Sequence, residues 1–226
     1  MIKNKLSWLL FSIMLCCMVS LNAAHPSLQV LSGDHSKLQS DFNSKLWSEA
    51  VLIDKFKVPV DYKTLKPAEE QTAVRILADN KNLYFLVRAF DANLNKAKVE
   101  PPPVDGYLNK FPIGDHLELQ LSTGVKKILA FDMNGNKFSS TTYKPDKYCN
   151  YGLVTKRTPA GWEAIVTIKI SSLKIPKLSK TKKIQLQVVR HLDHGDKPIR
   201  SFAKGDSMIR YISVTIDETN TNKKVK

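Results

Sequence analysis

Short runs of alternating apolar and polar residues constrain the fold of this chain more than any other feature. The clearest run is HLELQLS at 116–122, where three leucines alternate with His116, Glu118 and Gln120. Successive side chains of a strand point to opposite faces of its sheet. The run therefore predicts a strand whose leucines face a core and whose polar residues face outward.

Similar runs recur along the chain between turn signals. Strands are expected at 72–79, 82–91, 184–192 and 208–216. A hairpin is expected at 126–143, because the dipeptide Asn134-Gly135 favours a tight turn between two strands. A second hairpin is expected at 152–170, with its turn at 159–161.

The overall pattern predicts an all-β fold. No long segment repeats its apolar residues at helical spacing, and single helical turns are expected only near 46–51 and 171–173. Many short strands with frequent turns are typical of a sandwich. We therefore expect one antiparallel β-sandwich of immunoglobulin-like or jelly-roll type over 41–216. A lead-in at 24–40 precedes it, and a polar, basic tail at 217–226 follows it.

The first 23 residues are typical of a signal peptide. Lys3 and Lys5 form a positive start, the segment 6–21 is almost wholly apolar, and small residues surround Ala23. The apolar segment is shorter than the ~20 residues that span a bilayer. The sequence thus predicts cleavage near Ala23, a secreted or periplasmic protein, and no membrane span in the mature form.

Cysteine usage fits this expectation. Cys16 and Cys17 lie inside the apolar segment, which leaves a lipoprotein as a minor alternative, although small residues do not precede them. After cleavage only Cys149 remains, so no internal disulfide is expected. The core alone must stabilise the fold.

Five segments resemble family 9 carbohydrate-binding modules in order and spacing. They are DFNSKLWSEAVLIDKF (41–56), VRILADNKNLYFLVRAFDANLNK (74–96), GDHLELQLS (114–122), GWEAIVTIKISSL (161–173) and IQLQVVR (184–190). Each motif is weak by itself, but together they cover the chain from about Asp41 to Ile216. The resemblance implies a β-sandwich that binds polysaccharide or oligosaccharide without catalysis, as an accessory to carbohydrate breakdown by separate O-glycosyl hydrolases.

The same resemblance implies a sugar site. The family clamps a terminal sugar between two tryptophans, and polar side chains bind its hydroxyls. The clamp positions fall near Pro112 and in 202–204, where this chain has no tryptophan, whereas Glu118 matches the family's acidic residue. Other aromatic rings would then have to stack on the sugar. The predicted sugar-binding residues are Glu118, Phe111, Tyr107 and Phe202.

No catalytic residue is predicted. Asp115 and Glu118 are three residues apart, so one strand would place them on opposite faces. A glycosidase needs two carboxyl groups across one bond, roughly 5–10 Å apart. Asp115 is instead expected to hold a turn or to meet Arg190. A glycoside hydrolase-associated enzyme of unrecognised type stays an alternative.

Metal and haem sites are weaker alternatives. A non-covalent haem would need axial ligands from Met133, Met208, His116 and His191. A structural calcium ion would draw on the loop aspartates Asp79, Asp91 and Asp105. The run 191–196 resembles a metal site in composition, but it is expected to be a solvated loop after a strand. No cofactor is therefore predicted, and calcium stays open.

The charge balance leaves one more class of partner open. Lys and Arg number 35 against 21 Asp and Glu, a formal charge of +14. A lysine-rich segment at 169–183 could meet an acidic polysaccharide, and a polyanion-binding domain is a further alternative. Nucleic acid is not expected, because no nucleic-acid module signature accompanies the lysines. The oligomeric state is not predicted.

Three aromatic features complete the expectations. Trp47 and Trp162 are expected in the core, since both lie in motifs that anchor strands. A tyrosine cluster fits either a stacking surface or packing on the sandwich equally well. Its members are Tyr143, Tyr148 and Tyr151.

Overall fold

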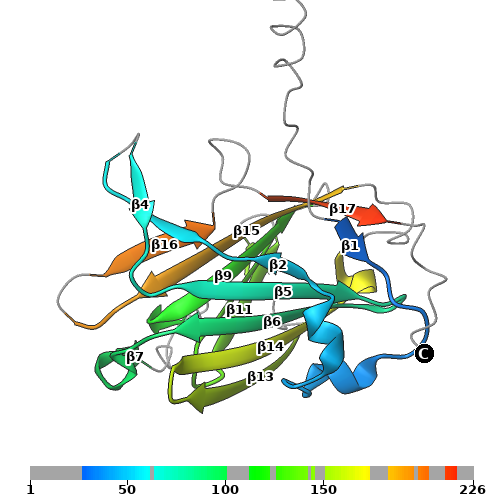
Figure 1. Cartoon of the computed structure of the whole chain (residues 1–226), viewed down its shortest axis with the longest axis horizontal. Helices are drawn as coiled ribbons and strands as arrows, with labels where there is room; N and C mark the ends of the chain where they lie inside the picture. The colour runs from blue at the N-terminus through cyan, green and yellow to red at the C-terminus, as the bar shows by residue number, and fades with distance from the viewer. Residues whose placement is uncertain are drawn as a thin grey trace, which may run out of the picture.

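Two β-sheets stacked face to face form the protein (Figure 1). The computed structural model describes residues 27–61, 64–100, 112–122, 126–141, 144–145, 151–173, 183–195, 198–203 and 212–217. The helical segments within them are four 3-10 turns: η1 (Ser36–Gln39), η2 (Lys45–Ser48), η3 (Leu94–Lys96) and η4 (Ile170–Leu173). In these ranges, no helix is long and apolar enough to cross a membrane. The expected all-β sandwich is confirmed.

The larger sheet contains ten strands. Its continuous path runs β12 (Lys144–Pro145), β11 (Lys137–Thr141), β10 (Lys126–Phe131), β9 (His116–Ser122), β15 (Lys183–Leu192), β16 (Ile199–Ala203), β3 (Phe56–Pro59) and β4 (Leu65–Pro67). The other two strands are β17 (Ile212–Asp217) and β1 (Ser27–Gln29). β17 pairs with the first half of β15, and β1 pairs with β17 in parallel. All other pairs in this sheet are antiparallel. In the strand order, β9 and β15 lie at the centre.

The smaller sheet lies in front of the larger one in Figure 1. Its order is β13 (Tyr151–Thr158), β14 (Gly161–Lys169), β6 (Asn82–Phe90), β5 (Thr72–Ala78) and β2 (Val51–Ile53). A two-stranded ribbon, β7 (Val99–Glu100) with β8 (Ile113–Gly114), leads into β9. Because the larger sheet has more strands, β16, β3 and β4 extend beyond the smaller sheet at one side.

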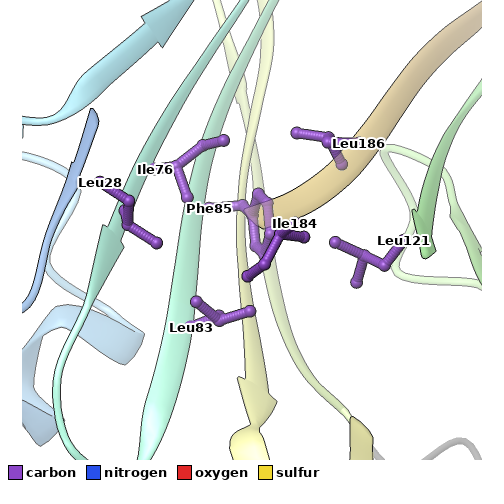
Figure 2. Close-up of a pocket in the computed structure, with 7 residues that line it drawn as sticks. All are labelled: Leu28, Ile76, Leu83, Phe85, Leu121, Ile184 and Leu186. Carbon is purple, nitrogen blue, oxygen red and sulfur yellow. The ribbon is translucent and has the colours of Figure 1, made fainter. Parts of the chain in front are cut away.

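Apolar side chains from both sheets fill the space between them. The leucines of β9 are all buried there, as their alternation predicted. Figure 2 shows part of this layer, where side chains from β1, β5, β6, β9 and β15 meet. The cavity among them has a volume of about 10 Å³, which is room for one water molecule at most. This is the dense packing typical of a single large core.

The two tryptophans are core residues, as expected. Trp162 of β14 is 1% exposed and packs edge-on against Phe131 between the sheets. Trp47 is 4% exposed and belongs to a second apolar cluster, with Tyr84 and Ile165, on the outer face of the smaller sheet. Its indole N–H donates to the carbonyl of Asp41 at 2.8 Å. Neither tryptophan is available as a sugar platform.

Most of the expected strands are present, and the short ones were missed. Both predicted hairpins form, and Gly135 has φ +84° in the first turn, a conformation that favours glycine. The expected strand at 208–216 is β17, which begins at Ile212, and residues 208–211 lie outside the described ranges. Strand β1 lies in the segment expected as a lead-in, so the sandwich begins before residue 41. Strands of three to five residues, such as β1, are too short to show a period.

Candidate functional site

The pairing of β9 with β15 creates two polar clusters on opposite faces of the larger sheet. The register places His116 opposite His191 and Leu117 opposite Arg190. Because side chains alternate between faces, His116 and His191 lie on the outer face while Arg190 points inward. The adjacent residues 190 and 191 therefore belong to different sites.

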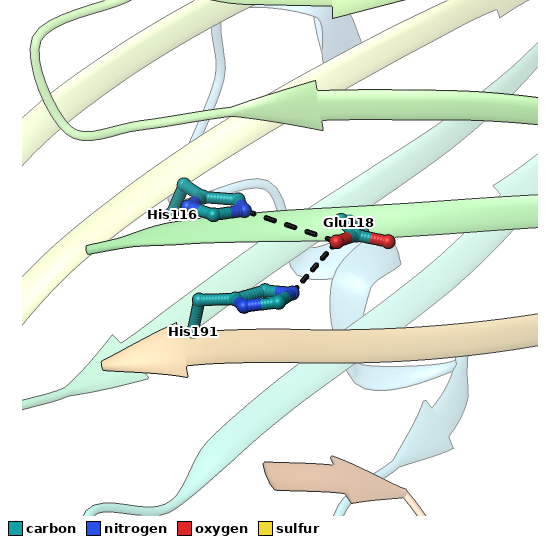
Figure 3. Close-up of side chains that lie close together, drawn as sticks. All are labelled: His116, Glu118 and His191. Atoms are coloured by element: carbon teal, nitrogen blue, oxygen red, sulfur yellow. Dashed lines mark hydrogen bonds and ion pairs between the residues drawn. The ribbon is translucent and has the colours of Figure 1, made fainter. Parts of the chain in front are cut away.

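The outer cluster is built around the carboxylate of Glu118. His191 Nε2 lies 2.6 Å from Glu118 Oε1, and His116 Nε2 lies 3.8 Å from the same oxygen (Figure 3). The imidazole rings stack with 4.2 Å between centroids and 10° between planes. Gln120 donates from Nε2 to Glu118 Oε2 at 2.9 Å. Among the described residues, three polar side chains thus surround one carboxylate.

Burial differs within this outer cluster. The side chains of His116 and Glu118 are 7% and 9% exposed, whereas that of His191 is 27% exposed. The polar residues of β9 do lie on the outer face, as predicted, but they are not solvated. Burial alone would raise the pKa of Glu118, but its contacts with His116, His191 and Gln120 outweigh burial and hold the pKa well below its ordinary value. Glu118 is therefore an anion that solvent reaches mainly past His191.

The inner cluster is a buried ion-pair network. Arg190 Nη2 lies 3.0 Å from Asp115 Oδ2 and 3.4 Å from Asp91 Oδ2, and all three side chains are 0% exposed. Its Nη1 donates to the carbonyl of Phe90 at 2.7 Å. His194 Nε2 contacts Asp91 Oδ2 at 3.0 Å. The predicted pairing of Asp115 with Arg190 is confirmed. Because Phe90 ends β6, the network joins the two sheets.

A groove opens where the larger sheet extends past the smaller one. Its volume is about 440 Å³, within the usual range for small-molecule pockets. Val58, Leu192 and Ile199 supply apolar lining. Polar lining residues include Lys66, Glu69, Glu70, Asn93, His194 and Arg200. Leu192 and Ile199 pair with each other on the same inner face as Arg190, so the groove borders the inner cluster. It approaches the outer face at Arg200, the cross-strand partner of His191.

The structure describes two of the four predicted sugar-binding residues, Glu118 and Phe202. Glu118 and Phe202 share the outer face, on either side of Val189, which pairs with both. Phe202 is 1% exposed, so its ring is covered as the structure stands. Tyr107 and Phe111 lie outside the described residues. Sugar contact by these four stays a prediction.

The alternative ligands predicted from sequence find little support in the described residues. Met133 packs in the core while His116 and His191 lie on the outer face, so these residues do not form a haem pair, and Met208 lies outside the described ranges. Asp79 accepts hydrogen bonds from the backbone of Lys81 and Asn82 and from Tyr84, which makes it a turn cap.

Several other predictions fall partly on residues that the structure does not describe. They concern Asp105, Tyr143, Tyr148 and the lysines within 174–182. Tyr151, the described tyrosine of its cluster, is 5% exposed and donates to the carbonyl of Ala130 at 2.7 Å. It therefore packs on the sandwich and offers no stacking surface.

Sequence reasoning did not bring His191 together with Glu118. The two are 73 positions apart, and only the register of β9 with β15 makes them neighbours. One signal was available, since His116 and Glu118 share a strand face at alternate positions and a second histidine ends the strand predicted at 184–192. The groove and Arg200 had no comparable signal, because β16 and β3 were not predicted.

The fold is similar to three solved carbohydrate-binding structures. A protein from Bacteroides uniformis, proposed to bind carbohydrate, has a TM-score of 0.58 at 9% identity, covering 86% of this chain and 100% of its own. A family 9 carbohydrate-binding module from Caldicellulosiruptor kristjanssonii, solved with cellotriose, has a TM-score of 0.56 at 13% identity and covers 88% and 98%. A family 9 module from the same organism, solved with glucose, has a TM-score of 0.54 at 13% identity and covers 84% and 94%.

No family model matches the sequence, and no curated protein matches it. At 9–13% identity the structural likeness establishes the fold alone. The chain has the β-sandwich fold of family 9 carbohydrate-binding modules, and the similarity covers nearly the full length of those domains.

Proposed function

We propose that this protein binds an oligosaccharide of the cello-oligosaccharide class without breaking it down. The likeness to domains solved with cellotriose and glucose, over 84–88% of this chain, carries the proposal. The identities are too low to transfer a site. The location must therefore be argued from the residues of this chain.

The binding surface that we propose is the groove, with Arg200 at the edge where it approaches the outer cluster. Sugar hydroxyls need fixed donors and acceptors, and Lys66, Glu70 and Arg200 supply charged groups along the groove. Val58, Leu192 and Ile199 give the groove an apolar floor for the carbon face of a sugar. Glu118 stays a proposed sugar contact on the outer face, whereas the ring of Phe202, at 1% exposed, would first have to be uncovered.

We further propose that residues 1–23 direct export and that the mature protein works beside separate O-glycosyl hydrolases. The positive start and apolar run of this segment support export. The accessory role is supported by the fold and by the buried pairing of Asp115, which leaves Glu118 with no partner carboxylate among the described residues of the outer cluster. A hydrolase would need that second group.

Affinity electrophoresis tests glycan binding directly. The protein without residues 1–23 is run in gels that contain a cellulose derivative, xylan, alginate or a sulfated polysaccharide, at low and high salt, with a chelator throughout. Retardation by the cellulose derivative that persists at high salt is expected, because a specific sugar contact is not screened by ions. Arg200→Ala and Glu118→Ala should each weaken it about tenfold, since a hydrogen bond to a charged group is lost.

The matched control is Arg157→Ala. Arg157 is also an exposed arginine, but it lies on β13, the outermost strand of the smaller sheet. It changes the net charge by the same amount and should leave retardation unchanged. Retardation only at low salt, equally weakened by both arginine variants, would replace the proposal with polyanion binding. No retardation by any glycan would overturn it.

A further inference from the structure

We propose that His116, Glu118 and His191 bind a divalent transition-metal ion of the zinc class. Their ligand atoms all lie within 4.8 Å of one another on two hydrogen-bonded strands. Two imidazole nitrogens and one carboxylate oxygen are a ligand set that zinc takes in many proteins, with its remaining position open. Metal binding here needs no glycan, and glycan binding needs no metal.

The distances in the outer cluster bracket those that a metal ion requires. Zinc bonds of about 2.0–2.2 Å place neighbouring tetrahedral ligand atoms about 3.3–3.5 Å apart. The contact of Glu118 Oε1 with His191 Nε2 is 2.6 Å, and that with His116 Nε2 is 3.8 Å. One contact must lengthen and the other shorten, each by less than ~1 Å. Because the rings are nearly parallel, metal binding also requires them to rotate about Cβ–Cγ so that both nitrogens point toward one ion.

Neighbouring groups already orient the ligands. The carbonyl of Gly114 can only accept, so at 2.8 Å it takes a hydrogen from His116 Nδ1, and His116 turns Nε2 toward Glu118. Gln120 holds Glu118 Oε2 and leaves Oε1 for the histidines. Gly114 has φ +84°, and a Cβ there would lie 2.0 Å from the carbonyl oxygen of Lys98, so its position is fixed. Second partners of this kind fix the tautomer and direction of metal ligands.

Charge distinguishes this cluster from the inner one. Asp91, Asp115 and His194 also lie close enough to hold an ion, but the guanidinium of Arg190 already contacts both carboxylates. In the described part of the chain, no lysine or arginine forms an ion pair with Glu118. A metal ion would supply the positive charge that the outer cluster lacks, and His191, at 27% exposed, gives it access.

Calorimetric titration with zinc tests metal binding. The full chain, purified without a histidine tag and stripped with a chelator that is then removed, is titrated with Zn²⁺ in the absence of glycan. One site per chain is expected. His191→Ala and Glu118→Gln should each lower the affinity more than tenfold, and Gln120→Ala should lower it about 10–100-fold through misorientation of Glu118. Cobalt should give a visible absorption band that His191→Ala abolishes.

Two other histidines provide matched controls. His35 bonds to the Ser32 carbonyl far along the chain, and His194 belongs to the inner cluster. His35→Ala and His194→Ala should keep full affinity. Absence of zinc binding, unchanged affinity in His191→Ala, or loss of affinity in His194→Ala would each overturn the assignment. Circular dichroism of each metal-free variant shows whether it is folded. If an alanine variant does not fold, Glu118→Gln, which keeps the side-chain size, still tests the site.

Discussion

One histidine–carboxylate cluster lies on each face of the larger sheet around β9 and β15, and the two clusters differ in what balances the negative charge. On the inner face the guanidinium of Arg190 contacts both Asp91 and Asp115, and none of the three side chains is exposed. On the outer face Glu118 has only histidines and an amide as partners among the described residues, and His191 is partly exposed. A built-in counterion closes the inner cluster to ligands, whereas the outer cluster is complete only when something else supplies positive charge.

The largest expected effect separates the two clusters by stability. Arg190→Met should lower the free energy of unfolding by about 3–5 kcal/mol, because it leaves two buried carboxylates without a cation. His191→Ala, the adjacent change, should cost less than about 1 kcal/mol, since its contact is partly exposed. Urea denaturation with a chelator present measures both. Equal losses would show that the inner cluster has no special structural role.

Removal of one inner carboxylate should have an intermediate effect. Asp115→Ala leaves Arg190 bonded to Asp91 and to the Phe90 carbonyl, so only part of the network is lost. A cost of about 1–3 kcal/mol and a lower melting temperature are expected. Thermal unfolding followed by circular dichroism is sufficient to see it. An unchanged melting temperature would contradict the assignment of Asp115 to the network that joins the sheets.

The smallest expected effect is that the stability contributions of Glu118 and Asp115 change in opposite directions with pH. Burial raises the pKa of Asp115, and Arg190 offsets only part of the rise, whereas hydrogen bonds hold the pKa of Glu118 below its ordinary value. The stability from Glu118 is therefore present above its unfolded pKa of about 4.3 and lost as pH falls below it. That from Asp115 is present below about 3.9 and lost as pH rises through its raised pKa.

Two isosteric variants test this opposition in metal-free protein. Between about pH 3 and pH 6, the stability advantage of the wild type over Glu118→Gln should grow. Its advantage over Asp115→Asn should shrink over the same interval, because the ionised form of Asp115 is disfavoured by burial. Urea midpoints at several pH values give both curves. Parallel curves would show that the two carboxylates have the same environment.

The same two clusters show which parts of the candidate site could be predicted from the sequence. The pairing of Asp115 with Arg190 was one of the two roles that the sequence suggested for Asp115. His116, Glu118 and His191 were each noticed, but as candidates for different ligands. Alternation along a strand assigns a residue to a face, whereas the register between strands depends on packing across the whole sheet. That register was not readable from either strand alone.

Fold prediction had a similar limit. Long alternating runs such as 116–122 located the central strands and the sandwich class. Strands β1 to β4 and β16 have three to five residues each, and β1 and β3 pair with strands distant in sequence. The groove lies among these strands. Because the strands were not predicted from the sequence, the groove was not predicted either.

The parallel pairing of β1 with β17 has a consequence for how the protein is made. Ser27 pairs with Thr215, so nearly the whole domain must leave the ribosome before β1 can be hydrogen-bonded into its sheet. At synthesis rates of about 5–20 residues per second, that interval is roughly ten seconds or more. During it the place that Leu28 takes in the core stays open. The nascent chain therefore remains, for that time, a substrate for any factor that holds proteins unfolded.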